Sequence, residues 1–519
     1  MMNKLFTYIG LIAAVLLTGC YKDKGNIDYK PLSEAEISGI ESAYTLYLGD
    51  KWNVPVEIEY SLNTPEEVAY LWKVDGDTIA TTKDLDVVVS FSLKENMTAE
   101  YVVTDLSNGV RTIVPFTVTV KSEFSQGWMI LSEQAEHSAL GYFRDGDGRF
   151  YEDIYNAINQ KHLNKGASRL VEHFLSPFEP TVTALTGQVF VACSDGPDYS
   201  VDLDGDSFER VIYTRDEFVG GAPADFKPEV YESMPSMETG KGFDYLISNG
   251  KVYTRALYDG LSFQDGLYSN IPYAYNGGNY KLAPAILRGN IIWGDYLLGF
   301  DNVSGSFVQL TDGEVLTLDP GADMAGGFSM VNTGLTWIDG GTVAIFNDVE
   351  GTFDTYVTFM RDSDGNVNMM YFQVMPKMLM GSLAYMSIIQ MPIMDTEGNP
   401  VVWGGNIINE NTRFAYCDKG NLLYIASGYN LYAFDYTMMA LSLLKTYDKP
   451  IVEIGMNRLN QMELGIAFDN GNGTSDFGVA DVSYMGGGEI KGGKFYTVEG
   501  KVKDILYKVG NQLLISGMN

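Results

Sequence analysis

An acidic segment holds the clearest metal-binding pattern of the sequence. Asp202, Asp204 and Asp206 alternate along a stretch that reads Asp-Leu-Asp-Gly-Asp-Ser. Carboxylates at the first, third and fifth positions match the start of a calcium-binding loop, because Ca²⁺ takes hard oxygen ligands. Two later positions depart from that pattern, since Ser207 replaces the glycine and Tyr213 replaces the bidentate glutamate. Asp-Gly steps also make hairpin turns, so the segment predicts either a calcium site or a turn.

A second segment is rich in aromatic rings separated by glycines and asparagines. Rings on a polar loop can stack on sugars or grip peptide side chains, because each offers a large apolar surface at a small entropic cost. Aromatic residues also fill the cores of β-structures. The segment therefore predicts a ligand platform, with core packing as the alternative. Its members are Phe263, Tyr268, Tyr273, Tyr275 and Tyr280.

Sequence motifs of enzymes are missing. The chain has no His-Glu-x-x-His, no Gly-x-Ser-x-Gly and no complete phosphate-binding Gly-x-x-x-x-Gly-Lys-Ser/Thr. It has only three histidines, which leave little for a histidine-based zinc site. Its 67 acidic residues provide many carboxylate pairs, so glycoside hydrolysis by such a pair stays an alternative. We expect no enzymatic activity.

Sulfur-containing side chains are predicted to pack rather than to react. Eight methionines lie between Met369 and Met394. Thioethers can bind Cu(I), but the segment contains no histidine or cysteine, and methionine also fills irregular cores. Cys193 and Cys417 are far apart and flanked by strand-like residues. We expect both to be buried free thiols.

The N-terminus predicts a lipid anchor. Lys4 is the only charge before an apolar run at 5–17, which is too short to span a bilayer and is typical of a signal peptide. Leu-Thr-Gly precedes Cys20 directly, as in the lipobox of bacterial lipoproteins. We therefore expect removal of residues 1–19, acylation of Cys20 and a polar tether over 20–27. Acyl chains of this kind anchor a protein to a membrane without spanning it.

The charge balance excludes one class of partner. The chain carries 35 Lys and Arg against 67 Asp and Glu, a net charge of −32. Such a surface repels nucleic acid and anionic lipid. The acids are spread along the chain, which favours solubility as their role. The more specific alternative is that the acidic residues bind calcium or another cationic partner.

Residues 28–121 are predicted to form an immunoglobulin-like β-sandwich. Runs such as 54–60, 70–74 and 116–120 alternate in polarity or are β-branched, with turn residues between them. Asp75-Gly76-Asp77 predicts a hairpin turn. Trp72 fits the position of the buried tryptophan of such sandwiches.

Part of this region resembles a known family. Residues 20–29 read Cys-Tyr-Lys-Asp-Lys-Gly-Asn-Ile-Asp-Tyr. Together with the Tyr-x-Trp strand at 70–72 and the Val-Thr-Val strand at 118–120, this opening resembles the PKD-like lipoproteins of Bacteroidota. The resemblance covers the first 125 residues best. It implies an accessory surface lipoprotein that accompanies a SusC/SusD-like outer-membrane importer. The Lys-Asp pair after the cysteine resembles the signal for the outer face of the outer membrane.

Residues 127–519 are predicted to form a β-propeller-like domain. Strand-turn-strand pieces with Asn-Gly, Asp-Gly and Lys-Gly turns recur along this stretch. At about 40–50 residues per blade, it holds seven or eight blades. An extended two-sheet β-structure is the alternative. One helix is expected from Glu152 to Asn164, with Ile154, Ile158 and His162 on one face.

These observations combine into one leading hypothesis and two alternatives. The leading one is an all-β, non-enzymatic surface lipoprotein whose PKD-like sandwich precedes a propeller-like domain that binds an oligopeptide or a glycan for a SusC/SusD-like importer. The first alternative is a surface glycoside hydrolase with two carboxylates in the propeller channel. The second is a purely structural subunit of the importer complex.

Overall fold

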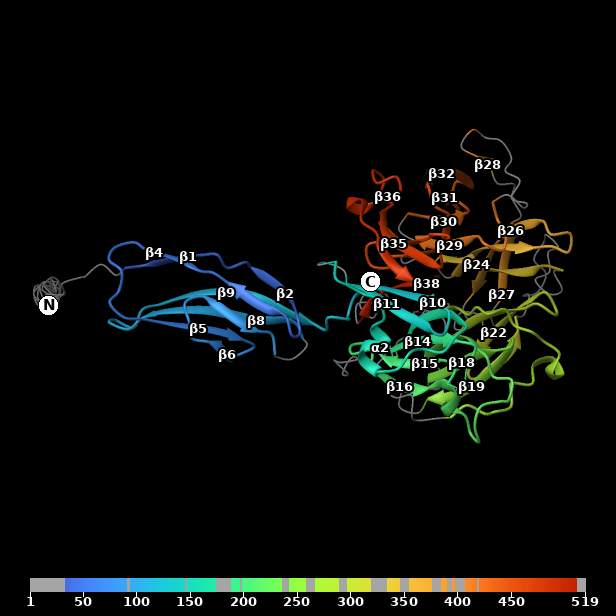
Figure 1. Cartoon of the computed structure of the whole chain (residues 1–519), viewed down its shortest axis with the longest axis horizontal. Coiled ribbons are helices and arrows are strands. Elements are labelled where there is room, and N and C mark those ends of the chain that lie inside the picture. Colours follow the sequence, from blue (N-terminus) through green and yellow to red (C-terminus); the bar gives the residue numbers. More distant parts are fainter. Residues whose placement is uncertain are drawn as a thin grey trace, which may run out of the picture. The chain divides into compact units, whose positions relative to one another are not determined.

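The computed structural model is all-β and divides into two compact units, Met1–Lys121 and Ser122–Asn519 (Figure 1). No helix of the described residues is long and apolar enough to cross a membrane. The structure describes residues 33–90, 94–144, 146, 148–173, 188–196, 198–235, 242–257, 267–288, 296–318, 334–345, 354–375, 384–389, 394–395, 397, 407–417 and 420–510.

The first unit is a β-sandwich built on a five-stranded sheet of order β2-β9-β8-β5-β6. Two short antiparallel pairs, β1-β4 and β3-β7, complete it. β2 runs parallel to β9, and the other neighbours are antiparallel. The strands are β1 (Ala35–Ser38), β2 (Ala43–Tyr47), β3 (Lys51–Val54), β4 (Glu57–Tyr60), β5 (Val68–Val74), β6 (Asp77–Ala80), β7 (Leu85–Val88), β8 (Lys94–Asp105) and β9 (Arg111–Lys121).

Alternation along the strands explains the core of the sandwich. In β3, Trp52 and Val54 are buried while the residues between them are exposed, which is the period of two expected for a half-buried strand. Trp72 is fully buried and packs against Tyr101 with 4.3 Å between ring centroids. Asp75 (φ 52°) and Gly76 (φ 91°) form the turn between β5 and β6. The predicted hairpin and the buried tryptophan are confirmed.

The second unit consists of seven sheets among the described residues, which we call blades 1 to 7. Blade 1 has the order β12-β11-β10-β38, and the next three follow in chain order. The strands are β10 (Gly127–Glu133), β11 (Ser138–Arg144), β12 (Phe150–Tyr151) and β38 (Lys501–Lys508) in blade 1; β13 (Ala167–His173), β14 (Gln188–Cys193), β15 (Val201–Asp204) and β16 (Arg210–Tyr213) in blade 2; β17 (Pro228–Pro235), β18 (Gly242–Ser248) and β19 (Lys251–Leu257) in blade 3; and β20 (Leu287–Arg288), β21 (Leu297–Asp301), β22 (Ser306–Thr311) and β23 (Glu314–Thr317) in blade 4.

Blade 5 follows chain order, β28 of blade 6 pairs parallel with β32, and in blade 7 β37 pairs with β35 in addition to β36. Short 3₁₀ turns lie at η1 (Thr214–Glu217), η2 (Tyr275–Gly278) and η3 (Lys491–Gly493). The strands are β24 (Thr336–Ile345), β25 (Asp354–Arg361), β26 (Val367–Met375) and β27 (Ala384–Ile389) in blade 5; β28 (Met394–Asp395), β29 (Arg413–Cys417), β30 (Leu422–Ser427), β31 (Asn430–Asp435) and β32 (Ala440–Thr446) in blade 6; and β33 (Ile451–Met456), β34 (Glu463–Asp469), β35 (Thr474–Asp481), β36 (Glu489–Ile490) and β37 (Tyr496–Glu499) in blade 7.

Pairing between the two ends of this unit makes the fold propeller-like. The last strand, β38, pairs antiparallel with the first, β10, so blade 1 contains both ends of the unit (Figure 1). Buried Glu172 of β13 accepts the backbone N–H groups of Val509 (3.0 Å) and Gly510 (2.9 Å), just beyond β38. Seven successive sheets with this pairing agree with the predicted propeller and not with an extended two-sheet structure.

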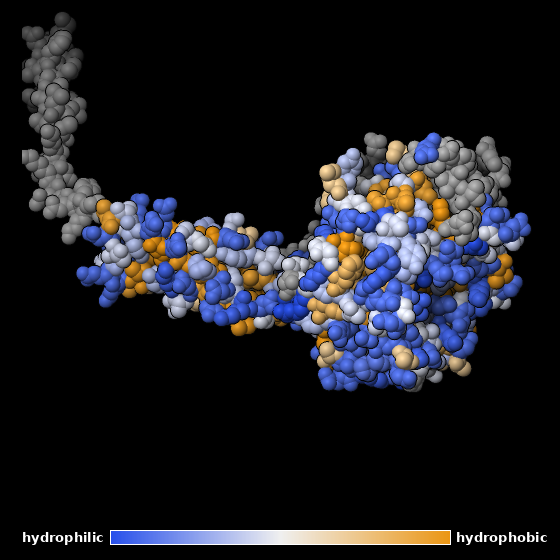
Figure 2. Space-filling model, turned by 45° about the horizontal axis from the view of Figure 1, so that its top comes forward, coloured by the Kyte–Doolittle hydropathy of each residue, from blue (hydrophilic) through white to orange (hydrophobic). Residues whose placement is uncertain are grey.

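Apolar side chains between adjacent blades form the core. Met129 and Leu140 of blade 1 pack with Val191 and Leu203 of blade 2 in one buried cluster. Strands buried on both faces read as nearly continuous apolar runs. Hydrophilic residues dominate the face of this unit that Figure 2 shows.

The helix α2 (Ile154–Asn159) is the only α-helix of the described residues, and it is shorter than predicted. It begins after Asp153, whose side chain accepts the N–H of Asn156 at 3.1 Å. It ends because Gln160 adopts a left-handed conformation (φ 54°). The expected end at Asn164 is therefore wrong, and His162 lies beyond the helix. Ile154 is buried and packs on blade 1.

Candidate functional site

A cavity of about 1070 Å³ lies among the inner strands of the propeller-like unit. Its walls come mainly from β13, β20, β24, β29, β33 and β38, which belong to six blades, and Arg361 of β25 and the segment before β29 also contribute. Ligand pockets of small molecules are typically about 300–1,000 Å³. The cavity is therefore large enough for a ligand of several amino-acid or sugar units.

Ion pairs line the cavity wall. Arg169 of β13 donates to both carboxylate oxygens of Asp339 in β24, at 2.8 and 2.6 Å. Arg413 of β29 donates through Nε to Glu453 of β33 at 2.9 Å. The Arg169 and Asp339 side chains are 26% and 55% exposed, and Arg413 is 36% exposed. These charged groups can therefore reach a ligand as well as each other.

Backbone irregularities place these charges on the wall. The register of β13 shifts between Ala167 and Arg169, and that of β33 shifts next to Glu453. The register of β24 shifts across the segment that contains Asp339, and that of β38 shifts next to Asp504. A β-bulge re-aims side chains that regular alternation would send elsewhere. These register shifts consequently turn charged side chains toward the cavity, although the residues next to them in the same strands are apolar.

Two acids of the wall have raised pKa values. Burial and the charge of Asp504 raise the pKa of Glu453 to about 8, although Arg413 opposes the shift. Burial likewise raises the pKa of Asp504 to about 6, and Arg169 opposes that shift. Carboxyl groups with raised pKa values in a cavity are typical of functional sites. Asp504 is also structural, because its two oxygens accept the N–H groups of Leu170 (2.6 Å) and Ile505 (2.9 Å).

An aromatic group adds an apolar surface to the same wall. Trp337 lines the cavity and stacks on Phe300, with 5.9 Å between ring centroids. The indole N–H of Trp337 finds no hydrogen-bond acceptor among the described residues. Buried polar groups normally have a partner, but this nitrogen is itself buried, so Trp337 offers the cavity its ring and not its N–H group.

A second charged cluster is sealed inside the blades. Arg255 of β19 donates to Glu217 of η1 and to Asp244 of β18, each at 2.6 Å. All three side chains are at most 2% exposed. The Arg255 guanidinium also lies 4.6 Å from the ring centroid of Tyr268. None of these residues lines the cavity.

Asp202 belongs to this sealed cluster and not to a calcium loop. It is 1% exposed and accepts a hydrogen bond from Thr214 at 3.3 Å. Burial and Glu217 raise the pKa of Asp202 well above its usual range, and burial raises that of Glu217 to about 7. Their mutual hydrogen bond raises the pKa of Asp202 and lowers that of Glu217, so Asp202 loses its proton at a higher pH than Glu217 does. Arg255 supplies the positive charge that the sequence prediction assigned to calcium.

The other two aspartates of that segment make a turn. Oδ1 of Asp204 accepts the N–H groups of Asp206 (3.0 Å) and Ser207 (2.9 Å), which closes the loop between β15 and β16. The backbone carbonyl of Asp206 accepts a hydrogen bond from Ser122 at 2.6 Å. Among the described residues, these carboxylates form no group that could hold a metal ion. The hairpin-turn alternative is therefore confirmed for the loop between β15 and β16, and calcium binding stays a prediction.

The predicted aromatic platform is divided between cores. Tyr268 and Tyr280 are 0% and 2% exposed, so they cannot present a ring to a ligand. The Tyr280 hydroxyl instead donates to the carbonyl of Tyr273 at 2.8 Å. Tyr273 and Tyr275 are half-buried, and Tyr275 forms a hydrogen bond with Thr317. Phe263 lies outside the described residues. For Tyr268 and Tyr280, core packing is the correct alternative.

The remaining candidates have simpler outcomes. Cys193 and Cys417 are buried free thiols, as predicted. Met369 and Met370 are buried in cores, which agrees with packing rather than copper binding. Cys20 lies outside the described residues. The charged residues of the cavity wall were not predicted, because an isolated charged residue at a β-bulge belongs to no recognisable sequence motif.

Part of the chain matches a known protein family. Residues 20–166 match the model of the PKD-like family, which spans the sandwich and the start of the propeller-like unit. No curated protein sequence matches the chain. The chain is also similar to two solved structures at low identity.

The first of these is a quinonprotein alcohol dehydrogenase-like protein from Bacteroides thetaiotaomicron. It is 12% identical, the alignment covers 90% of this chain and 96% of that one, and the TM-score is 0.37. The second is a β-propeller domain from Myceliophteria thermophila, with 9% identity, 69% and 98% coverage and a TM-score of 0.39.

Proposed function

We propose that this chain is a lipid-anchored protein of the outer-membrane surface that binds a polar oligomer in the cavity for a SusC/SusD-like importer. The observation that carries the proposal is a cavity of about 1070 Å³ lined by partly exposed ion pairs. The anchor rests on Cys20 and its preceding Leu-Thr-Gly. The importer rests on the resemblance of residues 20–29 to PKD-like lipoproteins and on the match to that family's model.

The chemistry of the wall favours an oligopeptide over a neutral glycan. Arg169 and Asp339 present opposite charges side by side, and Arg413 adds a positive charge beside the carboxyl group of Glu453. A peptide carries charges of both signs and can exchange partners with such pairs, whereas a neutral glycan leaves them unchanged. Charge complementarity of this kind supplies specificity more than bulk affinity. A glycan remains the second outcome of the binding test.

Ligand binding is tested with peptide and glycan arrays and the full chain. The Arg169→Gln variant should lose about tenfold in affinity for the selected ligand, since hydrogen bonds to charged groups contribute about 1.5–3 kcal/mol. Lys445→Gln is the control, because Lys445 pairs with Glu489 and lies outside the cavity wall. Equal affinity of wild type and Arg169→Gln would place the ligand elsewhere.

The importer association is tested separately. The tagged, lipidated chain is recovered from its native membranes in mild detergent, and co-purifying proteins are identified by mass spectrometry. Stoichiometric recovery of a SusC/SusD-like pair supports the proposal. Recovery of the lipoprotein alone contradicts the association but leaves the binding function to the array result.

A hydrolase is the second candidate, because Glu453 and Asp504 both line the cavity and both have raised pKa values. Two carboxyl groups are what a glycosidase needs. The role of Asp504 in holding the N–H groups of β13 and β38 argues against its use as a nucleophile. Turnover of a bound glycan that Glu453→Gln abolishes would establish the hydrolase.

A further inference from the structure

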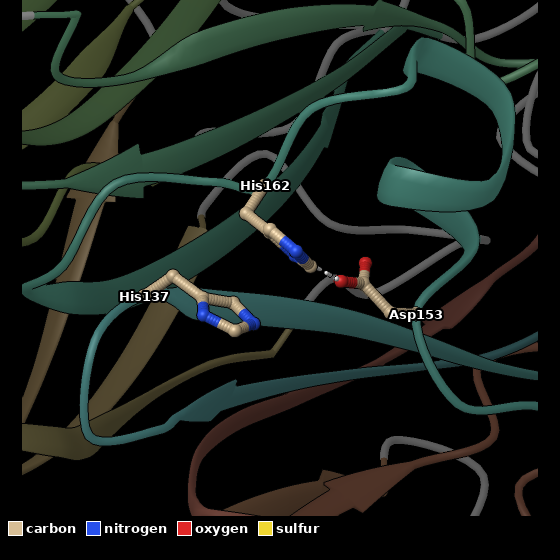
Figure 3. Close-up of side chains that lie close together, drawn as sticks. All are labelled: His137, Asp153 and His162. Carbon is tan, nitrogen blue, oxygen red and sulfur yellow. Dashed lines mark hydrogen bonds and ion pairs between the residues drawn. The ribbon is translucent and has the colours of Figure 1, made fainter.

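Two histidines and an aspartate from three separate segments meet at the surface of blade 1 (Figure 3). His137 lies in the turn between β10 and β11, Asp153 caps α2, and His162 follows that helix. One ligand atom of each residue lies within 4.8 Å of the others. The side chain of Asp153 is 16% exposed and that of His162 is 49% exposed. The group is therefore accessible to an ion from solution.

Backbone hydrogen bonds fix the position of these three residues. Ser138 donates its N–H to the carbonyl of Leu163 at 3.3 Å, which holds the segments of His137 and His162 side by side. Gln134 donates to the carbonyl of His137 at 2.8 Å and closes the hairpin turn. Preorganised ligands lose little conformational entropy when an ion binds.

The side-chain geometry leaves suitable atoms for a metal. Asp153 uses Oδ1 to cap α2 at Asn156, while its Oδ2 lies 3.1 Å from Nδ1 of His162. The rings of His137 and His162 lie close together, with 3.8 Å between their centroids and an angle of 35° between their planes. Each imidazole ring therefore brings a nitrogen atom to the same place as the free carboxylate oxygen of Asp153.

We propose that His137, Asp153 and His162 form a binding site for a divalent transition-metal ion of the Zn²⁺ type. Imidazole nitrogen and carboxylate oxygen are ligands that Zn²⁺ prefers, at about 2.0–2.2 Å. Three protein ligands leave further coordination positions for water or for an external carbonyl or carboxylate group. The bound ion would join the β10–β11 turn to α2. This inference is independent of the ligand cavity, which none of the three residues lines.

The test is a Zn²⁺ titration of the full chain by isothermal calorimetry, with excess Mg²⁺ present to occupy surface carboxylates. Binding of one ion per chain is expected, and Co²⁺ should show the visible bands of a site with nitrogen and oxygen ligands. Asp153→Asn removes the carboxylate but keeps a good helix cap, and His162→Gln removes one imidazole. Each should weaken Zn²⁺ binding at least about tenfold, since even outer-shell substitutions cost that much.

His173→Gln is the matched control, because His173 is the only histidine of the sequence outside the group. It should leave the Zn²⁺ affinity unchanged. Absence of stoichiometric binding would overturn the proposal, and so would equal affinities of Asp153→Asn, His162→Gln and His173→Gln. Circular dichroism of each variant separates loss of a ligand from loss of folding, and His137→Gln provides a third independent variant.

Discussion

Two arginines of the propeller-like unit bind carboxylates at the same distance but in opposite surroundings. Arg169 approaches Asp339 to 2.6 Å on the cavity wall, where the two side chains are 26% and 55% exposed. Arg255 approaches Asp244 to 2.6 Å inside the blades, where exposure is 1% and 0%. Water can replace either partner of the first pair and neither partner of the second.

The backbone explains this difference. Asp244 and Arg255 are direct cross-strand partners in the regular register of β18 and β19, so both side chains enter the same packed layer. Arg169 and Asp339 belong to different blades and lie at shifts of register. Charge pairing alone therefore does not identify a site. Access, which bulges provide here, separates a wall that can bind a ligand from a structural ion pair.

The largest effect is expected when the sealed cation is removed. Arg255→Met leaves Glu217 and Asp244 buried without their partner. Breaking a buried ion pair costs about 3–5 kcal/mol, because an uncompensated charge remains away from water. Denaturant unfolding of the full chain should show a loss of this size in the free energy of unfolding.

Arg169→Met is the matched substitution on the cavity wall. The exposed Arg169–Asp339 pair should contribute at most about 1 kcal/mol, as surface pairs usually do. Similar losses for Arg169→Met and Arg255→Met would remove the distinction between the two clusters.

The fold was predictable to the extent that it depends on local patterns. Alternation and turn residues predict the sandwich, with buried Trp72 and the Asp75-Gly76 turn, and the repeated strand pieces predict the blades. Partners that are distant in sequence were not predictable. Arg169 contacts Asp339 only because the blades bring β13 near β24. The residue spacing within either strand does not predict that contact.

The calcium prediction shows that residue types and spacing alone do not determine which side chains converge. The carboxylates at 202–206 have the right types and spacing, and on a regular strand residues two apart share a face. The register of β15 shifts between Asp202 and Leu203, however, which breaks that alternation. Asp202 consequently enters the sealed cluster, while Asp204 closes a turn on its own loop. A metal loop needs its ligands to converge, and a strand followed by a turn separates them. His137 and His162 converge instead, although the sequence separates them by α2.

A change of pH should have an intermediate effect on the free energy of unfolding. The sealed cluster and the cavity wall should respond over different pH ranges. The pKa of Glu217 is raised from 4.5 to about 7 on folding, so the folded chain retains a proton that the unfolded chain releases. This contribution is fully present below the unfolded pKa and is lost as the pH rises through about 7. Glu217→Gln should flatten the fall in stability between pH values of about 5 and 7, by on the order of 1–3 kcal/mol.

The contribution of Glu453 to stability should also fall with rising pH, but over a higher pH range, because its pKa is raised to about 8. Glu453→Gln should flatten the fall that continues up to a pH of about 8. The measurement is the free energy of unfolding of both variants and wild type across this pH series. Identical pH profiles of wild type and Glu217→Gln would contradict the proton retained in the sealed cluster.

The smallest effect is expected from salt. Asp339→Asn removes the exposed anion of the wall pair and should cost about 0.5 kcal/mol at low ionic strength. This cost should vanish in concentrated salt, since mobile ions screen exposed charges over about 3 Å at 1 M. Asp244→Asn removes an anion that mobile ions cannot approach, so its cost should persist in the same salt series. Equal salt dependence of the two variants would mean that water reaches both arginines, and the cavity wall would lose its claim to be the accessible charged surface.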